Sequence, residues 1–435
     1  MSVTKKNDHA KNDHAKNEKK LSVIVYFFAL YSLISVTLSL IIGKSQPAVL
    51  SSSYGDYERT DLFYGLVQGN FGNPWEFHPE IPDLRNQPYF PLPFLIIKLF
   101  GIKVNSFSKD MFYVQAWTLG SIILINYVIW KILKEYSYKF KITFIISFGL
   151  FSIPIAYIFT TGNLQGYATF IIFLAFINNK SGILSFISTV LTVSFKPQYV
   201  IINLANYLRS LNKLRVYFLA CITGGLFSLF GFSLFGDDII SNIKYVQSSS
   251  KMFTNPKPEF LLHLNASLVG NLTAIETYFF PKNISEPFTF KFILLITILV
   301  FLISSYLILQ LIKNKIYSWP VVFILVGIPT FLTPVSYNYS LTLILIPLVI
   351  FFRDFKSNDK FTIAVVQNKL NLILFMFAIF LFFSPKPVYV VIIPKLADTN
   401  LFNMIDSFGY IFILIVIHRV LKTSTVLPIS KQDRQ

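Results

Sequence analysis

The stretch VIVYFFALYSLISVTLSLIIG, residues 23–43, decides the fold class of this chain because it is apolar almost throughout. A helix needs about 20 such residues to cross the hydrocarbon core of a bilayer. The stretches 292–312 and 363–384 have the same character. The composition agrees, since 54% of the residues are hydrophobic and only 14% are charged, which is unlike a water-soluble domain. The sequence therefore predicts an all-α, polytopic transmembrane helical bundle.

The charge balance is strongly basic, with 38 Lys and Arg residues against 21 Asp and Glu residues. An excess of this kind is typical of nucleic-acid-binding proteins, but also of multispan membrane proteins, whose cytoplasmic loops accumulate Lys and Arg. Here the basic residues cluster between long apolar stretches. We therefore expect membrane lipids, and no nucleic acid, as partners.

The chain divides into two tails and one domain. Residues 1–21 contain a decaying five-residue repeat, KNDHA, with many charges and few apolar side chains. This composition predicts a disordered basic cytoplasmic tail. Residues 22–421 are predicted to form a single transmembrane domain, and 422–435 a second cytoplasmic tail. The lysines that precede residue 22 place the N-terminus in the cytoplasm.

Odd-even counting of the basic turns from that start predicts about twelve spans with both termini inside. The expected spans are 22–43, 112–133, 142–160, 165–178, 181–195, 198–208, 215–236, 289–312, 317–333, 339–352, 363–384 and 408–421. The spans at 165–178 and 198–208 are shorter than a straight crossing needs, which predicts that they line a cavity. The loops 44–111 and 237–288 are then extracytoplasmic, and the apolar piece 90–101 within the first loop is expected to lie along the interface.

The first outer loop concentrates carboxylates next to aromatic residues, above all in the segment 54–94. Carboxylates accept hydrogen bonds from sugar hydroxyls, and aromatic rings pack against the C–H faces of sugars. A solvated loop with interfacial aromatic residues is the alternative interpretation. The candidate binding or catalytic residues of this loop are Asp56, Glu58, Arg59, Asp61, His78 and Tyr89.

Polar turns on the same predicted side provide the remaining candidates. Lys196, in SFKPQY (194–199), stands where positive charge is disfavoured. We expect it to bind an anion, either a lipid headgroup or a phosphate held in a site. The other candidates from these turns are Asn163, Gln165, Gln198, Tyr337 and Asn338.

The sequence contains no Walker-type loop, no HExxH motif and no Cys/His cluster, so no cofactor and no metal site is predicted. A divalent ion held by Asp56 together with Glu58 or Asp61 is an alternative that the carboxylates leave open.

Taken in order, these motifs resemble the integral-membrane glycosyltransferases with the C-type fold. The motif pattern resembles in particular glycosyltransferase family 87, which includes polyprenyl-phosphate-mannose-dependent α-mannosyltransferases. The matching elements are Asp56, Phe63-Tyr64, Asn73-Pro74-Trp75, Tyr89 to Pro93, Gly162-Asn163, Lys196-Pro197 and the segment TPVSYNYS (333–340). The resemblance covers residues 22–350. It departs from the family pattern at Pro93, which is displaced, and at 338–340, where relatives commonly have histidines.

The resemblance implies inverting transfer of a mannose-like hexose from a polyprenyl-phosphate donor to a lipid- or glycan-linked acceptor. The site would face the exterior or periplasm across a bacterial inner (plasma) membrane. Asp56 would be the general base, and Lys196 or Arg59 would steady the departing phosphate. The role of the family's late histidine would pass to another residue such as His78.

Two other classes of function stay open. A lipid-linked polysaccharide polymerase or ligase is expected to use arginines in its long outer loop, and 237–288 contains none. A non-enzymatic transporter or flippase is expected to have charged or broken spans near the membrane midplane and internal repeats.

Overall fold

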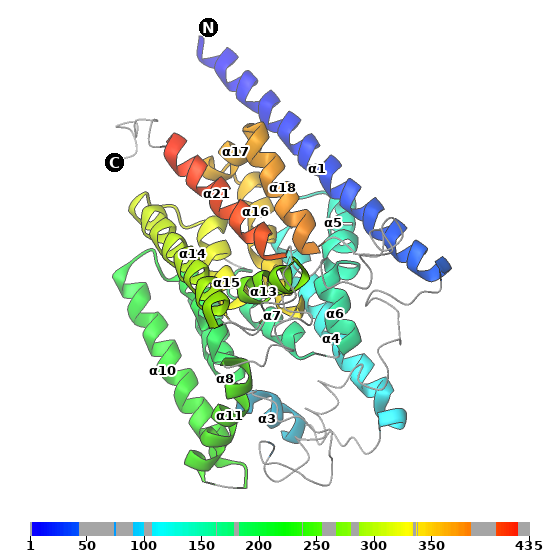
Figure 1. Ribbon diagram of the computed structural model, residues 1–435. Helices are drawn as coiled ribbons and strands as arrows, with labels where there is room; N and C mark the ends of the chain where they lie inside the picture. The colour runs from blue at the N-terminus through cyan, green and yellow to red at the C-terminus, as the bar shows by residue number, and fades with distance from the viewer. Residues whose placement is uncertain are drawn as a thin grey trace.

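The computed structural model describes residues 2–42, 74, 90–99, 107–161, 163–177, 182–236, 238–254, 267–279, 287–333, 336, 338–383 and 406–424. Within these residues the protein is all-helical and contains no β-strand, as the composition predicted (Figure 1).

The helices of the first half, with the short 3-10 and π turns labelled η, are α1 (Ser2–Ile42), α3 (Pro91–Leu99), α4 (Phe107–Ile132), α5 (Tyr138–Phe144), η1 (Ile145–Leu150), α6 (Ile153–Thr161), α7 (Gln165–Leu174), α8 (Gly182–Phe195), η2 (Pro197–Tyr199), α9 (Val200–Asn203), η3 (Leu204–Asn206) and α10 (Leu211–Ser233). Those of the second half are α11 (Ile239–Thr254), α13 (Leu268–Phe279), α14 (Pro287–Lys313), α15 (Trp319–Phe331), η4 (Asn338–Ile344), α16 (Leu345–Lys356), α17 (Lys360–Gln367), α18 (Lys369–Phe383) and α21 (Asp406–Ser424).

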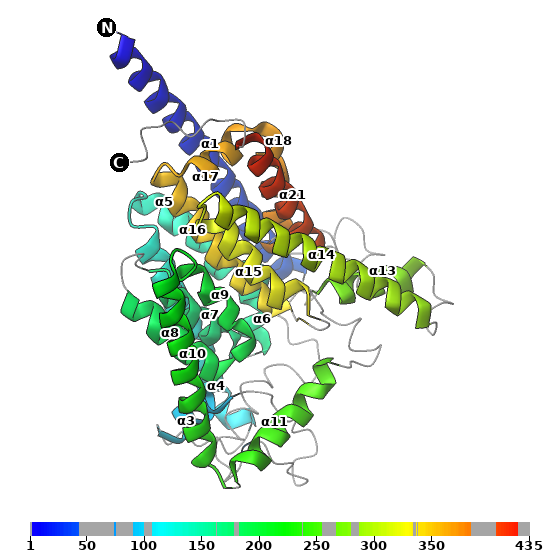
Figure 2. The ribbon, with the colours of Figure 1, turned by 90° about the vertical axis from the view of Figure 1, so that its left-hand side faces the viewer.

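The centre of the bundle is formed by α15 and α16, whose side chains are almost all buried. A helix that is apolar on every side belongs in an interior, because it has no polar face to present to water. The long helix α1 runs along the outside and projects beyond the bundle at its N-terminal end (Figure 1). Helices α3 and α11 lie at one end of the bundle, while α5 and α17 lie at the other (Figure 2).

Helix α1 begins at Ser2, so residues 2–21 are helical where the sequence predicted a disordered tail. The end of this segment packs against the bundle. Asn17 and Leu21 are buried, and Glu18 pairs with Lys356 of α16 at 2.6 Å. Extending an existing helix adds one hydrogen bond per residue without a new nucleation cost. The Lys- and Ala-containing repeat therefore continues the apolar helix that follows it.

Two described helices, Leu211–Ser233 and Lys291–Lys313, are long and apolar enough to cross a membrane, or three if the bent pair α17–α18 counts as one span. These findings indicate membrane association, and the number of crossings stays a prediction. The expected span at 198–208 is not one helix but the succession η2, α9 and η3.

The break between α17 and α18 has a local cause. Helices α17 and α18 meet at an angle of 96°. Asn368 between them adopts an extended backbone conformation, and its side chain accepts a hydrogen bond from the backbone N–H of Asn371 at 3.1 Å. An asparagine in this position ends one helix and caps the next, because its side-chain oxygen replaces the missing helical acceptor.

Helices α8 and α10 pack against each other through Gly224. A β-carbon at Gly224 would lie 2.7 Å from Cβ of Val193 and 2.9 Å from the carbonyl oxygen of Val190. The Ser194 hydroxyl donates to the Gly224 carbonyl at 3.1 Å. At the neighbouring Gly225 a β-carbon would meet no heavy atom within 4 Å. Gly224, and not Gly225, therefore lies at the close approach of the helices, as small residues do in membrane bundles.

We expect Gly224→Ala to lower the free energy of unfolding by about 1–3 kcal/mol, the usual cost of an overpacked contact. Gly225→Ala is the matched control on the same helix and should be neutral or stabilising by up to about 1 kcal/mol, because alanine is the better helix former. Thermal unfolding of both variants in detergent micelles measures the difference. Equal midpoints for the two variants would contradict the packing described here.

Candidate functional site

The candidate site begins at the N-terminus of α7, where the polar turn predicted from the sequence lies. The side-chain oxygen Oδ1 of Asn163 accepts a hydrogen bond from the backbone N–H of Gln165 at 2.8 Å. This contact satisfies one of the amides that a helix leaves without a partner in its first turn. Both Asn163 and Gln165 are buried, so the turn lies inside the bundle and not on a solvated surface.

Lys196 reaches this turn from the end of α8. The backbone N–H of Lys196 still bonds to the carbonyl of Thr192 at 2.9 Å, but Pro197 follows and ends the helix, because a residue before proline avoids the α conformation. Lys196 accordingly has an extended backbone, with φ of −145°. Its ammonium Nζ donates to Oε1 of Gln165 at 3.0 Å, across 31 residues of sequence.

Tyr199 and Ser340 complete the arrangement. The Tyr199 hydroxyl donates to the same Oε1 of Gln165 at 3.1 Å and lies 3.5 Å from the Ser340 hydroxyl on η4. The ammonium of Lys196 lies 5.5 Å from the centre of the Tyr199 ring. We call Asn163, Gln165, Lys196, Tyr199 and Ser340 the Gln165 cluster. It joins α7, the end of α8, η2 and η4 at one place.

Among the described residues, the side-chain amide of Gln165 is satisfied at its oxygen but not at its nitrogen. Because Oε1 of Gln165 receives two donors, the amide nitrogen Nε2 is directed away from them. This nitrogen is buried and has no hydrogen-bond partner within the described residues. A buried donor left in this way costs about 1–3 kcal/mol. An ammonium beside an unsatisfied amide N–H is the pattern that an anionic or oxygen-rich ligand would complete.

The structure brings together three of the residues predicted from the sequence, namely Asn163, Gln165 and Lys196. Gln198 is exposed and takes no part in the cluster. Asn338 begins η4, and the structure describes its backbone alone. The predicted residues that lie outside the described residues are Asp56, Glu58, Arg59, Asp61, His78, Tyr89 and Tyr337.

Sequence analysis did not select Tyr199 and Ser340. Tyr199 stands next to Gln198 in the same KPQY segment, and Ser340 lies two residues after Asn338. Both residues therefore lie in motifs that the sequence analysis selected. Which side chain of each motif points inward depends on the 3-10 turns η2 and η4. Such turns have no apolar periodicity long enough to assign a face.

Comparison of the chain with family models, with curated proteins and with solved structures gives no match. Among the described residues, no three His, Cys, Asp or Glu side chains gather as a metal site would require. The interpretation of the Gln165 cluster therefore depends on its own geometry.

Replacing Gln165 with leucine should destabilise the protein by about 1–3 kcal/mol, because the buried donors of the cluster lose their common acceptor. Gln198→Leu is the matched control, since it makes the same chemical change on an exposed residue and should alter the free energy of unfolding by less than about 0.5 kcal/mol. Thermal unfolding midpoints of the two variants test this. A loss for Gln198→Leu as large as that for Gln165→Leu would show that the cluster has no special place in the fold.

Proposed function

We propose that this protein is an integral-membrane glycosyltransferase that uses a polyprenyl-phosphate sugar as its donor and transfers a mannose-like hexose to a lipid- or glycan-linked acceptor. The observation that supports this most is the contact between Lys196 and Gln165. It brings a lysine and a buried amide N–H together inside an apolar bundle, where a phosphate would supply the missing acceptor.

The membrane placement is part of the same proposal. The chain would form about twelve crossings of the C-type glycosyltransferase arrangement, with its site on the outer face of a bacterial plasma membrane. Support comes from the two described helices that are long and apolar enough to cross. Further support comes from α3, which forms the short helix expected at the interface and lies at the end of the bundle opposite to α5 and α17 (Figure 2).

In the proposed reaction the acceptor hydroxyl attacks the anomeric carbon of the sugar. The bond from that carbon to the phosphate oxygen breaks, and its electron pair leaves with the polyprenyl phosphate. The hydroxyl proton passes to a carboxylate, for which the sequence favours Asp56, with Glu58 and Asp61 as the alternatives. A single displacement inverts the configuration. Lys196 and the Gln165 amide would stabilise the negative charge that grows on the leaving phosphate.

Lys196→Ala should weaken donor binding by roughly tenfold to a hundredfold, the equivalent of one charge-assisted hydrogen bond of about 1.5–3 kcal/mol. Lys196→Arg should keep part of the affinity because it keeps the charge. The measurement is equilibrium binding of radiolabelled polyprenyl-phosphate mannose to the full chain in nanodiscs.

Lys98→Ala is the control for this experiment. Lys98 on α3 is exposed, donates to the carbonyl of Leu234 at 3.0 Å, and takes no part in the Gln165 cluster. If Lys196→Ala and Lys98→Ala both bind the donor as the wild type does, Lys196 serves bulk lipid headgroups and the proposed site is wrong.

Asp56→Asn should reduce turnover by at least about a hundredfold, since asparagine has nearly the same shape but cannot accept a proton. Donor binding should survive the change. Transfer from labelled polyprenyl-phosphate mannose to acceptors in membranes that contain the protein is the assay, with Asp61→Asn as the matched variant. Normal turnover in Asp56→Asn together with loss in Asp61→Asn would refute the role of Asp56.

A further inference from the structure

A second polar region lies around a cavity of about 210 Å³. Its wall is formed by Phe176 just after α7, the start of α8, the turn from η3 into α10, and parts of α15 and α16. The polar lining residues are Asn206, Tyr207, Arg209, Lys213, Tyr317 and Arg353, together with Ser185. We call this the basic cavity.

The basic cavity and the Gln165 cluster lie at opposite ends of one helix pair. Helices α7 and α8 pack together, and they run antiparallel, because Ser188 of α8 bonds to the carbonyl of Ile171 at 2.7 Å while Lys196 beyond α8 meets Gln165 at the start of α7. The ten residues of α7 rise about 15 Å at 1.5 Å per residue. The two regions are therefore separate sites.

The charge around the cavity is positive. Arg209, Lys213 and Arg353 line it, and no Asp or Glu among the described residues does. Arg353 is paired with Asp354 at 3.0 Å, which offsets part of its charge. Arg209 and Lys213 are exposed and have no ion-pair partner or side-chain hydrogen bond within the described residues. Cations that converge on one cavity repel each other, and an anion between them removes that cost.

Two further features favour negative charge at this place. The side-chain nitrogen Nδ2 of Asn206 is buried and lacks a hydrogen-bond partner within the described residues, so an acceptor in the cavity would satisfy it. Arg209 and Lys213 also flank the first residue of α10, a helix of 23 residues capped by Ser210, whose hydroxyl accepts from the Lys213 N–H at 3.3 Å. The N-terminus of a helix attracts anions through its dipole.

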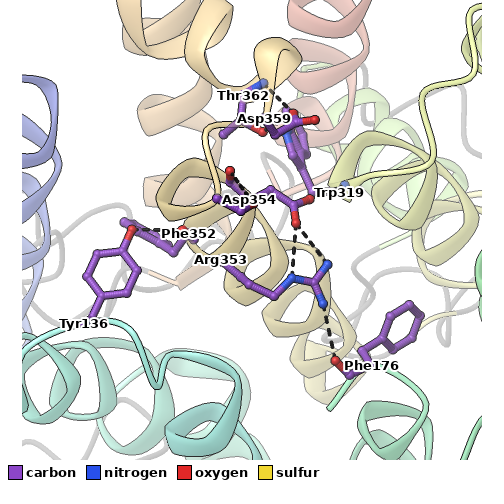
Figure 3. Close-up of polar contacts among 9 residues, drawn as sticks. Tyr136, Phe176, Trp319, Phe352, Arg353, Asp354, Asp359 and Thr362 are labelled. Carbon is purple, nitrogen blue, oxygen red and sulfur yellow. Dashed lines mark hydrogen bonds and ion pairs between the residues drawn. The ribbon is translucent and has the colours of Figure 1, made fainter. Parts of the chain in front are cut away.

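Arg353 is held in place by its neighbours (Figure 3). Its Nε and Nη2 atoms donate to Oδ1 of Asp354 at 3.1 and 3.0 Å, and Nη1 donates to the carbonyl of Phe176 at 3.4 Å. The other oxygen of Asp354 accepts the backbone N–H of Trp319 at 3.1 Å. One wall of the cavity is thus positioned before any ligand arrives, which reduces the entropy lost on binding.

We propose that the basic cavity binds a phosphoryl anion, with Arg209, Lys213 and Asn206 as donors beside the fixed guanidinium of Arg353. The same chemistry is offered by a free phosphate and by the headgroup of an anionic phospholipid. Basic residues in the turns of a membrane protein can also serve only to orient the chain across the membrane. That role requires neither a cavity nor a buried amide without a partner.

The test measures binding by the full chain purified in detergent, first of radiolabelled inorganic phosphate by equilibrium dialysis and then of phosphatidylglycerol by native mass spectrometry. We expect saturable binding of at least one of the two. Lys213→Gln and Arg209→Gln should each weaken it by at least about tenfold, the equivalent of one charge-assisted contact. Binding of phosphate would identify a soluble ligand, and binding of phosphatidylglycerol alone would identify a lipid headgroup.

Arg215→Gln is the matched control, because Arg215 is exposed on the same helix and is not among the residues that line the cavity. It should leave the affinity within about twofold, because Arg215 does not line the cavity and solvent and salt screen its exposed charge. Unchanged thermal midpoints show that the exposed variants are folded. Absence of binding of both probes to the wild type, or equal weakening by Arg215→Gln and Lys213→Gln, would overturn the proposal.

Discussion

The carboxylate of Asp354 is the contact on which the central helices depend. It is buried and accepts hydrogen bonds from Arg353 and from the backbone of Trp319 (Figure 3). Burial raises the pKa of this carboxyl, and the guanidinium beside it opposes that shift. The Trp319 ring in turn packs edge-on against Phe351, Phe361 and Phe375 of three different helices. The Trp319 N–H therefore ties the start of α15 to Asp354 of α16, and the contacts of the Trp319 ring extend this link to α17 and α18.

The antiparallel pair of α7 and α8 gives the molecule its two polar ends. Polar side chains along α8 are satisfied within the pair: Thr189 and Thr192 bond back to carbonyls four residues earlier at 2.7 Å. This local bonding gives each hydroxyl group a partner, so that none is left unsatisfied among lipid or apolar side chains. At each end of the pair, however, a buried amide nitrogen stays without a partner among the described residues, Nε2 of Gln165 at one and Nδ2 of Asn206 at the other. One cation, Lys196, lies beside the Gln165 amide, whereas three cationic side chains line the cavity beside Asn206. Each proposal rests on a buried amide nitrogen without a partner next to positive charge.

Parts of the fold follow directly from the sequence. The apolar stretches 292–312 and 215–236 correspond to α14 and α10, because long apolar runs favour helices that bury every backbone polar group. The structure of segment 198–208 does not follow from its sequence in this way. Its apolar residues predicted a span, and the chain instead forms three short helical turns. Helix α15 lies against these turns, and tertiary packing of this kind overrides a weak local preference.

The amino-acid sequence by itself determined that the protein is helical and apolar, that its cations lie between apolar segments, and that Asn163, Gln165 and Lys196 are worth testing. The sequence also contains the carboxylates of the first outer loop, among them Asp56, whose role remains a prediction. Only the tertiary structure decided that Lys196 meets Gln165, that Tyr199 and not Gln198 completes the cluster, and that Arg353 shares a cavity with Lys213. The physical reason is that these pairings join residues far apart along the chain, and their distances are set by how helices pack, which no local pattern specifies.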